Sequence, residues 1–160
     1  AVDYAPVSPD LLDFHDGKAG RMVRAALRQI DPDAPASVRV DDDAGRITLH
    51  LHPVDWTGLA LEDFRADALY YDPFGPKSEP DSWTTDCFEV ARAHMTPDAL
   101  LGTYSAATRV KRAMVAADLA IATAPGPGPK HEITYAARRP EALADHELLD
   151  RRKYLGDDDD

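Results

Sequence analysis

The chain has 160 residues, of which 44% are hydrophobic and 29% are charged, and its formal net charge is −11. This length suits one domain with a substantial core, and no apolar stretch approaches the roughly 20 residues of a membrane-spanning helix. The single cysteine, Cys87, excludes an internal disulfide and a thiolate metal centre. We therefore expect a cytoplasmic protein and no metal site.

The charges are unevenly distributed along the chain. Residues 101–140 contain six basic and two acidic residues, whereas acidic runs occur at 41–43 and 157–160. Acidic runs of this kind are typical of solvated segments. The local basic surplus permits contact with nucleic acid, which binds largely through Lys and Arg, but does not predict it.

The sequence of residues 2–51 predicts a strand, a helix and a hairpin. Val2 and Asp3 end a strand, and Ser8-Pro9 is typical of a helix start. The later half of this helix carries one apolar stripe at helical spacing, formed by Ala19, Met22, Val23, Ala26, Leu27 and Ile30. Residues 38–40 and 47–51 flank a polar turn and predict a β-hairpin, whose second arm we expect to continue into the core sheet.

The remaining chain alternates between strands and helices. We expect strands at 67–72, 100–104, 119–123 and 131–137, the last two as an antiparallel pair. Thr84 and Ser105 are placed to cap the two intervening helices. On the second helix the expected exposed side carries Arg109, Lys111 and Arg112. The pattern predicts an α/β, Rossmann-like fold with a mostly parallel sheet covered on both faces and a C-terminal antiparallel strand.

A strand that ends in a carboxylate precedes a proline-rich loop. Asp72 is followed by Pro73 and Phe74, and the loop ends at Trp83. Ligands of open α/β folds bind at the carboxyl ends of strands. We therefore expect a site for modifying a base, with the carboxylate of Asp72 beside flat ring-binding surfaces. Phe74 and Trp83 either stack on a base or pack the loop against the body.

Several motifs occur in the order found in one known family. Residues 67–76 with Pro80 and Trp83 resemble the Asp-x-Phe-x-Pro-x-x-x-Pro-x-x-Trp signature of the methyltransferase domain of MnmC-type tRNA wobble-uridine modification enzymes. Residues 102–107 are similar to its Ala-Thr-Tyr-Ser-Ala-Ala segment, and residues 126–132 to its Gly-Phe-Gly-Gly-Lys-Arg-Glu segment. Separate motifs in a shared order are more specific than any one of them.

The resemblance implies a class I S-adenosylmethionine-dependent methyltransferase. Such a domain methylates 5-aminomethyl-2-thiouridine of tRNA to 5-methylaminomethyl-2-thiouridine, and a fused or separate flavin-dependent oxidoreductase accompanies it. The glycine-rich turn after the first strand of this fold is not found, so the chain is expected to be N-terminally truncated. We expect residues 1–140 to form this partial domain and residues 141–160 to form a flexible acidic extension.

The resemblance also implies roles for individual residues. Asp3, Asp55 and Asp72 are the expected cofactor-binding residues, and Asp72 is the expected catalytic residue. The expected substrate-binding residues are Phe74, Pro76, Trp83, Tyr104, Lys130 and Glu132. Two alternatives are open: a methyltransferase acting on another amine, such as adenine, glutamine or a small molecule, and a non-catalytic RNA-binding or interaction module of the same fold.

Overall fold

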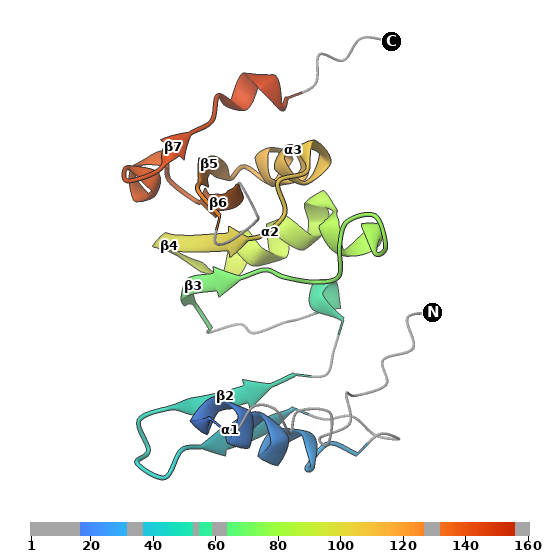
Figure 1. Cartoon of the computed structure of the whole chain (residues 1–160), viewed down its shortest axis with the longest axis vertical. Helices are drawn as coiled ribbons and strands as arrows, with labels where there is room; N and C mark the ends of the chain where they lie inside the picture. Colours follow the sequence, from blue (N-terminus) through green and yellow to red (C-terminus); the bar gives the residue numbers. More distant parts are fainter. Residues whose placement is uncertain (1–16, 32–36, 53–54, 59–63, 127–131, 156–160) are drawn as a thin grey trace. The chain divides into compact units, whose positions relative to one another are not determined.

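The computed structural model describes residues 17–31, 37–52, 55–58, 64–126 and 132–155 (Figure 1). Contacts divide the chain into two compact units, residues 1–55 and residues 56–160. The expected strand at Val2 and Asp3 and the expected helix start at Ser8 lie outside the described ranges. Within those ranges, no helix combines the length and apolarity that a membrane crossing requires.

The first unit contains a helix packed on a hairpin. Helix α1 (Lys18–Leu27) lies against the antiparallel strands β1 (Val38–Asp41) and β2 (Thr48–Leu51). Met22, Ala26 and Ile30 of the predicted apolar stripe are buried. The helical periodicity is therefore confirmed for this segment.

Asp42 organises the turn of the hairpin. Its Oδ1 accepts hydrogen bonds from the backbone N–H groups of Arg46 (2.7 Å) and Ile47 (2.8 Å), and Oδ2 pairs with Lys18 of α1. Gly45 has a φ of +63°, which glycine adopts without a steric cost. One prediction was wrong: β2 does not continue into the core sheet, because in the described part of the chain it pairs with β1 alone.

The second unit is built on a mixed five-stranded sheet with the order β3-β4-β6-β5-β7. Its strands are β3 (Ala66–Tyr70), β4 (Met95–Thr103), β5 (Ala120–Ala124), β6 (Ile133–Ala137) and β7 (Glu147–Leu148). The β3–β4 pair is parallel, whereas β6 lies antiparallel between β4 and β5, and β7 is antiparallel to β5. Strands β3, β4 and β5 therefore run in one direction.

This topology confirms the α/β class and corrects the expected pairing. The predicted antiparallel partnership of the last two strands is present, with Ala120 opposite Ala137. The prediction of a mostly parallel sheet was wrong. Strand β6 lies between β4 and β5, so that these two strands each pair with β6 in antiparallel orientation and do not pair with one another. Among the described strands, β3–β4 is the one parallel pair.

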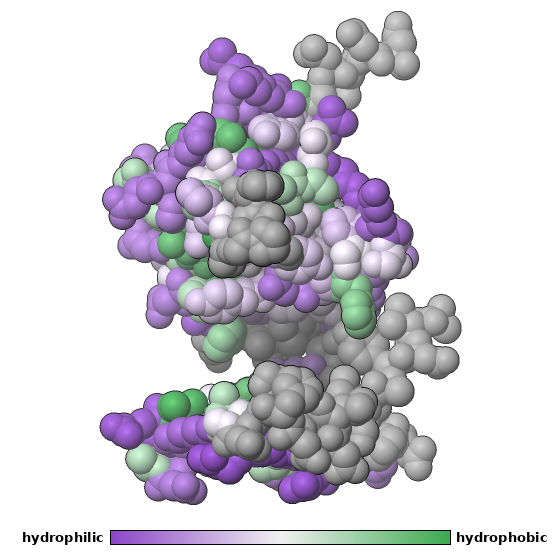
Figure 2. Space-filling model, in the orientation of Figure 1, coloured by the Kyte–Doolittle hydropathy of each residue, from purple (hydrophilic) through white to green (hydrophobic). Residues whose placement is uncertain are grey.

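The core lies mainly on one face of the sheet, where α2 (Thr85–His94) and α3 (Thr108–Ala116) pack (Figure 1). Phe88 of α2, Leu101 of β4 and Ile121 of β5 are fully buried there. Leu143 in the short 3-10 helix η4 (Pro140–Leu143) packs on the other face, against Ala122. Hydrophilic residues prevail on the visible surface in Figure 2.

Thr84 occupies the N-cap position of α2, as predicted, whereas the expected cap at Ser105 was wrong, because Ala107 precedes α3. The Thr84 hydroxyl makes no capping bond and instead donates to Sγ of Cys87 at 3.3 Å. Ser105 is buried three residues before α3, and its carbonyl accepts a 2.8 Å hydrogen bond from the hydroxyl of Thr134 in β6. Ser105 therefore joins the end of β4 to the neighbouring strand.

Residues 141–155 contribute ordered elements to the second unit. Strand β7 pairs with β5, and Leu143 is 1% exposed. The 3-10 helix η5 (Arg151–Lys153) follows, and Arg151 pairs with Asp118 at 3.0 Å. The division of the chain at residue 140 into a methyltransferase domain and a flexible extension stays a prediction.

Candidate active site at the end of strand β3

The carboxylate of Asp72 lies where two parallel strands end. Strand β3 ends at Tyr70, and the backbone N–H of Tyr71 still donates to the Gly102 carbonyl of β4 at 2.9 Å. Oδ1 of Asp72 then accepts a 3.3 Å hydrogen bond from the backbone N–H of Tyr104. The side chain of Asp72 is therefore exposed and oriented at the carboxyl edge of the sheet, as predicted.

Two hydrogen bonds hold the backbone immediately after Asp72. The Tyr104 hydroxyl donates to the Pro73 carbonyl at 2.9 Å, and Nε1–H of Trp83 donates to the Phe74 carbonyl at 2.8 Å. The rings of Trp83 and Tyr104 meet edge to face, with centroids 6.3 Å apart. These contacts tie both ends of the loop to the tip of β4.

The remainder of the loop is compact. The Gly75 carbonyl accepts hydrogen bonds from the backbone N–H groups of Ser78 (2.9 Å) and Glu79 (3.0 Å). Pro76 lies half-buried within this turn, and the hydroxyl of Tyr71 donates to the Ser82 carbonyl at 2.5 Å. Because the loop is bonded throughout its length, little ordering remains for a ligand to impose.

The two aromatic residues of the loop have different positions. Trp83 is 3% exposed and packs against Tyr71 and Phe88, so its indole belongs to the core. Phe74 is 79% exposed. The sequence left two roles open for these rings, stacking on a base and packing the loop against the body. Trp83 packs in the core, whereas the ring of Phe74 is accessible to a ligand.

Glu132 is paired with a lysine that the sequence placed on the wrong face. Lys111 is buried, and its Nζ lies 2.5 Å from Oε1 of Glu132. The expectation that Lys111 lies with Arg109 and Arg112 on the exposed side of the helix was wrong. Its long stem reaches past the apolar positions of α3, and the pair joins this helix to the start of β6.

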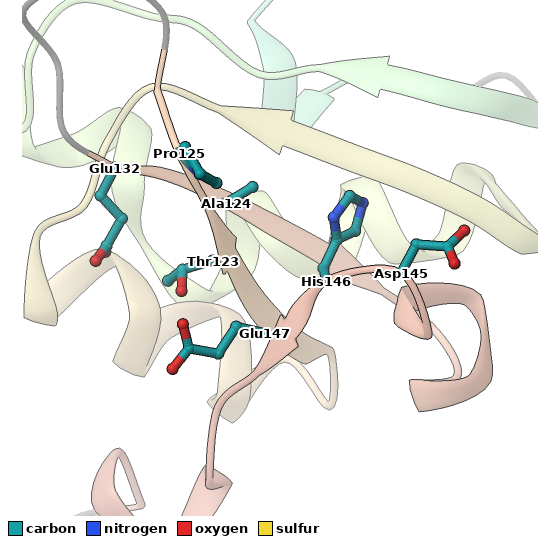
Figure 3. Close-up of a pocket in the computed structure, with 7 residues that line it drawn as sticks. All are labelled: Thr123, Ala124, Pro125, Glu132, Asp145, His146 and Glu147. Carbon is teal, nitrogen blue, oxygen red and sulfur yellow. The ribbon is translucent and has the colours of Figure 1, made fainter.

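A cavity of about 350 Å³ lies beside Glu132, at the ends of β5 and β7 (Figure 3). Thr123 and Glu147 are partners in neighbouring strands, and their side chains approach one another in Figure 3. Asp145 and His146 also line the cavity, and His146 stacks on Tyr135 with centroids 4.4 Å apart. Asp72 does not line this cavity.

Three of the expected site residues are not placed relative to Asp72. Asp3 and Lys130 lie outside the described residues. Asp55 is exposed and belongs to the first unit. Their roles stay predictions.

No grouping of ligands suitable for a metal ion occurs among the described residues. The rings of His50, in β2, and of His52, just after it, stack with centroids 6.2 Å apart. Cys87 is buried and packs in the core of the second unit.

The comparison with known families concerns most of the chain. The S-adenosyl-L-methionine-dependent methyltransferase family model matches residues 18–139. The chain belongs to this family. The resemblance to the methyltransferase domain of MnmC is thereby confirmed, and the family implies S-adenosylmethionine as cosubstrate.

Curated relatives of this methyltransferase are tRNA 5-methylaminomethyl-2-thiouridine biosynthesis bifunctional proteins MnmC. The protein from Hahella chejuensis is 30% identical over 142 residues, which cover 84% of this chain and 22% of the relative. The protein from Ralstonia nicotianae is 38% identical over 114 residues, covering 70% of this chain and 17% of the relative. The methyltransferase thus spans less than a quarter of the length of these relatives.

Among solved structures, the crystal structure of MNMC2 from Aquifex aeolicus resembles the methyltransferase with a TM-score of 0.46 and 24% identity. The match covers 49% of this chain and 26% of that chain.

Proposed function

We propose that this chain methylates the aminomethyl group of a tRNA wobble uridine, converting 5-aminomethyl-2-thiouridine to 5-methylaminomethyl-2-thiouridine. The observation that carries the proposal is the exposed carboxylate of Asp72 at the carboxyl end of β3, followed by a loop whose backbone is fixed by Tyr104 and Trp83. Membership in the methyltransferase family supports the reaction class. The MnmC relatives support the choice of substrate.

The reaction requires a neutral amine. An alkylammonium group has a pKa near that of lysine, about 10.4, so few amine groups are neutral at pH 7. Oδ1 of Asp72 is held by Tyr104, and no donor among the described residues is bonded to Oδ2. That oxygen can accept a hydrogen bond from the amine and receive its proton directly or through water.

The loop after Asp72 positions the substrate and does not itself transfer protons. When bound, S-adenosylmethionine supplies an electrophilic methyl group, which the amine nitrogen accepts as the carbon–sulfur bond breaks. Holding the nitrogen in line for this step contributes up to roughly 7–11 kcal/mol in well-oriented systems. Phe74, with its exposed ring, packs on the uracil, and Pro76 limits the movement of the turn.

The described residues fit the amine side of this reaction. The carboxylate of Asp72 can accept a hydrogen bond from the aminomethyl group, and the exposed ring of Phe74 can stack on the uracil. We assign cosubstrate binding to Asp72 with Asp3 and Asp55, and substrate binding to Glu132 and Lys130, by their positions in the MnmC-type motifs. We also propose that a flavin-dependent oxidoreductase, fused or separate, acts with this domain on tRNA.

The substrate is tested by supplying the protein that carries this chain with methyl-labelled S-adenosylmethionine. Three tRNA preparations are compared, with unmodified, aminomethylated or carboxymethylaminomethylated wobble uridine. We expect label only in aminomethylated tRNA, recovered as 5-methylaminomethyl-2-thiouridine after nuclease digestion. Label on adenine, on protein or on a small amine would indicate another amine substrate, and binding of tRNA without any transfer would indicate a non-catalytic module.

A further inference from the structure

A second cavity, of about 590 Å³, lies between the start of α2, the outer face of α3 and the chain after η5. Arg109 and Arg112 line it from α3, Thr84 and Thr85 from the start of α2, and Tyr154 from the C-terminal side. We propose that this cavity binds a phosphodiester group of the RNA substrate. This inference rests on the proposed function, because it assumes an RNA ligand.

The described lining of the cavity carries positive charge. Among the described residues, no Asp or Glu lines it, and neither Arg109 nor Arg112 forms an ion pair. Arg92 and Arg151 behave differently, because both pair with the carboxylate of Asp118 at 3.0 Å. In a chain of net charge −11, two arginines in one cavity that have no carboxylate partner in the described part of the chain favour an anionic ligand.

The geometry of the lining suits a phosphate. Arg109 and Arg112 are three residues apart on α3, which places their guanidinium groups on the same side of the helix. A planar guanidinium matches two phosphate oxygens at once. Thr84 and Thr85 bring the N-terminus of the ten-residue helix α2 to the same cavity, where backbone N–H groups have no partner within the helix. Asp86 in that first turn does not line the cavity.

The cavity begins, along the chain, where the loop of the candidate active site ends. Thr84 directly follows Trp83, whose indole holds the Phe74 carbonyl. The loop and the start of α2 both follow the carboxyl end of β3 along the chain, so we expect an RNA whose base lies at Asp72 to extend toward this cavity. The half-buried ring of Tyr154 gives the cavity an apolar wall on which a ribose or neighbouring base can pack.

The test compares two double variants that remove the same charge. Arg109→Ala/Arg112→Ala removes the arginines of the cavity, and Arg152→Ala/Lys153→Ala removes two exposed basic residues of η5 that do not line it. Binding of a fluorescent anticodon stem–loop RNA is measured by anisotropy over a range of salt concentrations, using the protein that carries the chain. Circular dichroism confirms that each variant folds.

We expect the cavity variant to bind this RNA at least about tenfold more weakly. The slope of the logarithm of its binding constant against the logarithm of the salt concentration should be smaller in magnitude by about 1–2. The control variant should lose less than about threefold, as expected for rim charges. Equal losses in the two variants, or no loss in either, would overturn the proposal. Label transfer is measured separately: RNA binding that needs the arginines without any methyl transfer refutes the proposed function and leaves the cavity assignment in place.

Discussion

Tyr104 contacts the candidate catalytic loop through two different groups. Its backbone N–H donates to Oδ1 of Asp72 at 3.3 Å, and its side-chain hydroxyl donates to the Pro73 carbonyl at 2.9 Å. One residue at the tip of β4 therefore orients the carboxylate and also fixes the peptide that follows it. The position of the acid depends on β4 as much as on β3.

Tyr104→Phe tests the side-chain half of this relationship. The change removes the donor to the Pro73 carbonyl while it keeps the ring that meets Trp83. We expect a loss of about 1 kcal/mol in the free energy of unfolding and a fall of roughly fivefold in kcat, with a smaller change in KM. Urea denaturation and steady-state kinetics measure these effects. Tyr135→Phe, in β6, is the control and should leave kcat unchanged.

Trp83 and Phe74 should differ in what their substitution affects. Trp83→Phe removes buried ring volume and the hydrogen bond to the Phe74 carbonyl, so we expect a loss of about 2 kcal/mol in stability. Phe74→Leu alters a side chain that is 79% exposed and should change stability by less than about 0.5 kcal/mol. Its effect should appear as a raised KM for tRNA. An unchanged KM would exclude Phe74 from substrate binding.

Substitutions of Lys111 and Glu132 should have non-additive effects on the free energy of unfolding. Glu132→Gln leaves the ammonium of Lys111 largely buried without its carboxylate, whereas Lys111→Met leaves a half-exposed carboxylate that water can solvate. We expect Glu132→Gln to cost about 1–2 kcal/mol, the double variant to recover part of that loss, and the coupling energy to be about 1 kcal/mol. A double-mutant cycle by urea unfolding gives this value, and strict additivity would show that the pair contributes nothing.

Acid should destabilise the hairpin unit through Asp42. The hydrogen bond from Lys18 and the backbone N–H of Ile47 lower the pKa of Asp42 from its usual 3.8 to about 2. A lowered pKa in the folded state means that the stabilisation is present above pH 3.8 and is lost as the pH falls toward 2.

The Asp42 prediction is checked by following the amide signals of Arg46 and Ile47 by NMR between pH 5 and pH 2, in steps of about 0.3 units. Asp42→Asn should weaken the hairpin at neutral pH and abolish its dependence on pH over this interval. Asp43→Asn, in the same turn, is the matched control. An identical acid response in the wild type and in Asp42→Asn would contradict the assignment.

Local patterns predicted much of the fold. Apolar spacing identified α1, turn chemistry identified the hairpin, and the alternation of strands and helices identified β3 and α2. The start of β4 was missed: the expected strand begins at residue 100, whereas β4 begins at Met95 and contains Pro97. In the structure the β3–β4 register shifts between Ala66 and Ala68, and the irregular pairing accommodates the proline.

Long-range features of the candidate site could not be read from the sequence in the same way. The exposed position of Asp72 follows from its place after a strand. The burial of Trp83 depends on Tyr71 and Phe88, and the burial of Lys111 depends on Glu132, 21 residues away. Helical periodicity alone assigns a lysine to solvent, because it carries no information about a distant carboxylate.

The most direct test of the account is the rate of methyl transfer to aminomethylated tRNA by Asp72→Asn, measured in a single turnover with the protein that carries this chain. The amide keeps the size of the side chain but cannot accept a proton, so we expect an unchanged fold and a rate lower by about 100-fold to 10,000-fold. Asp67→Asn, which changes a carboxylate of β3 that is bonded to Thr96, should retain the full rate. A wild-type rate for Asp72→Asn would contradict the central claim that this carboxylate holds the reacting amine.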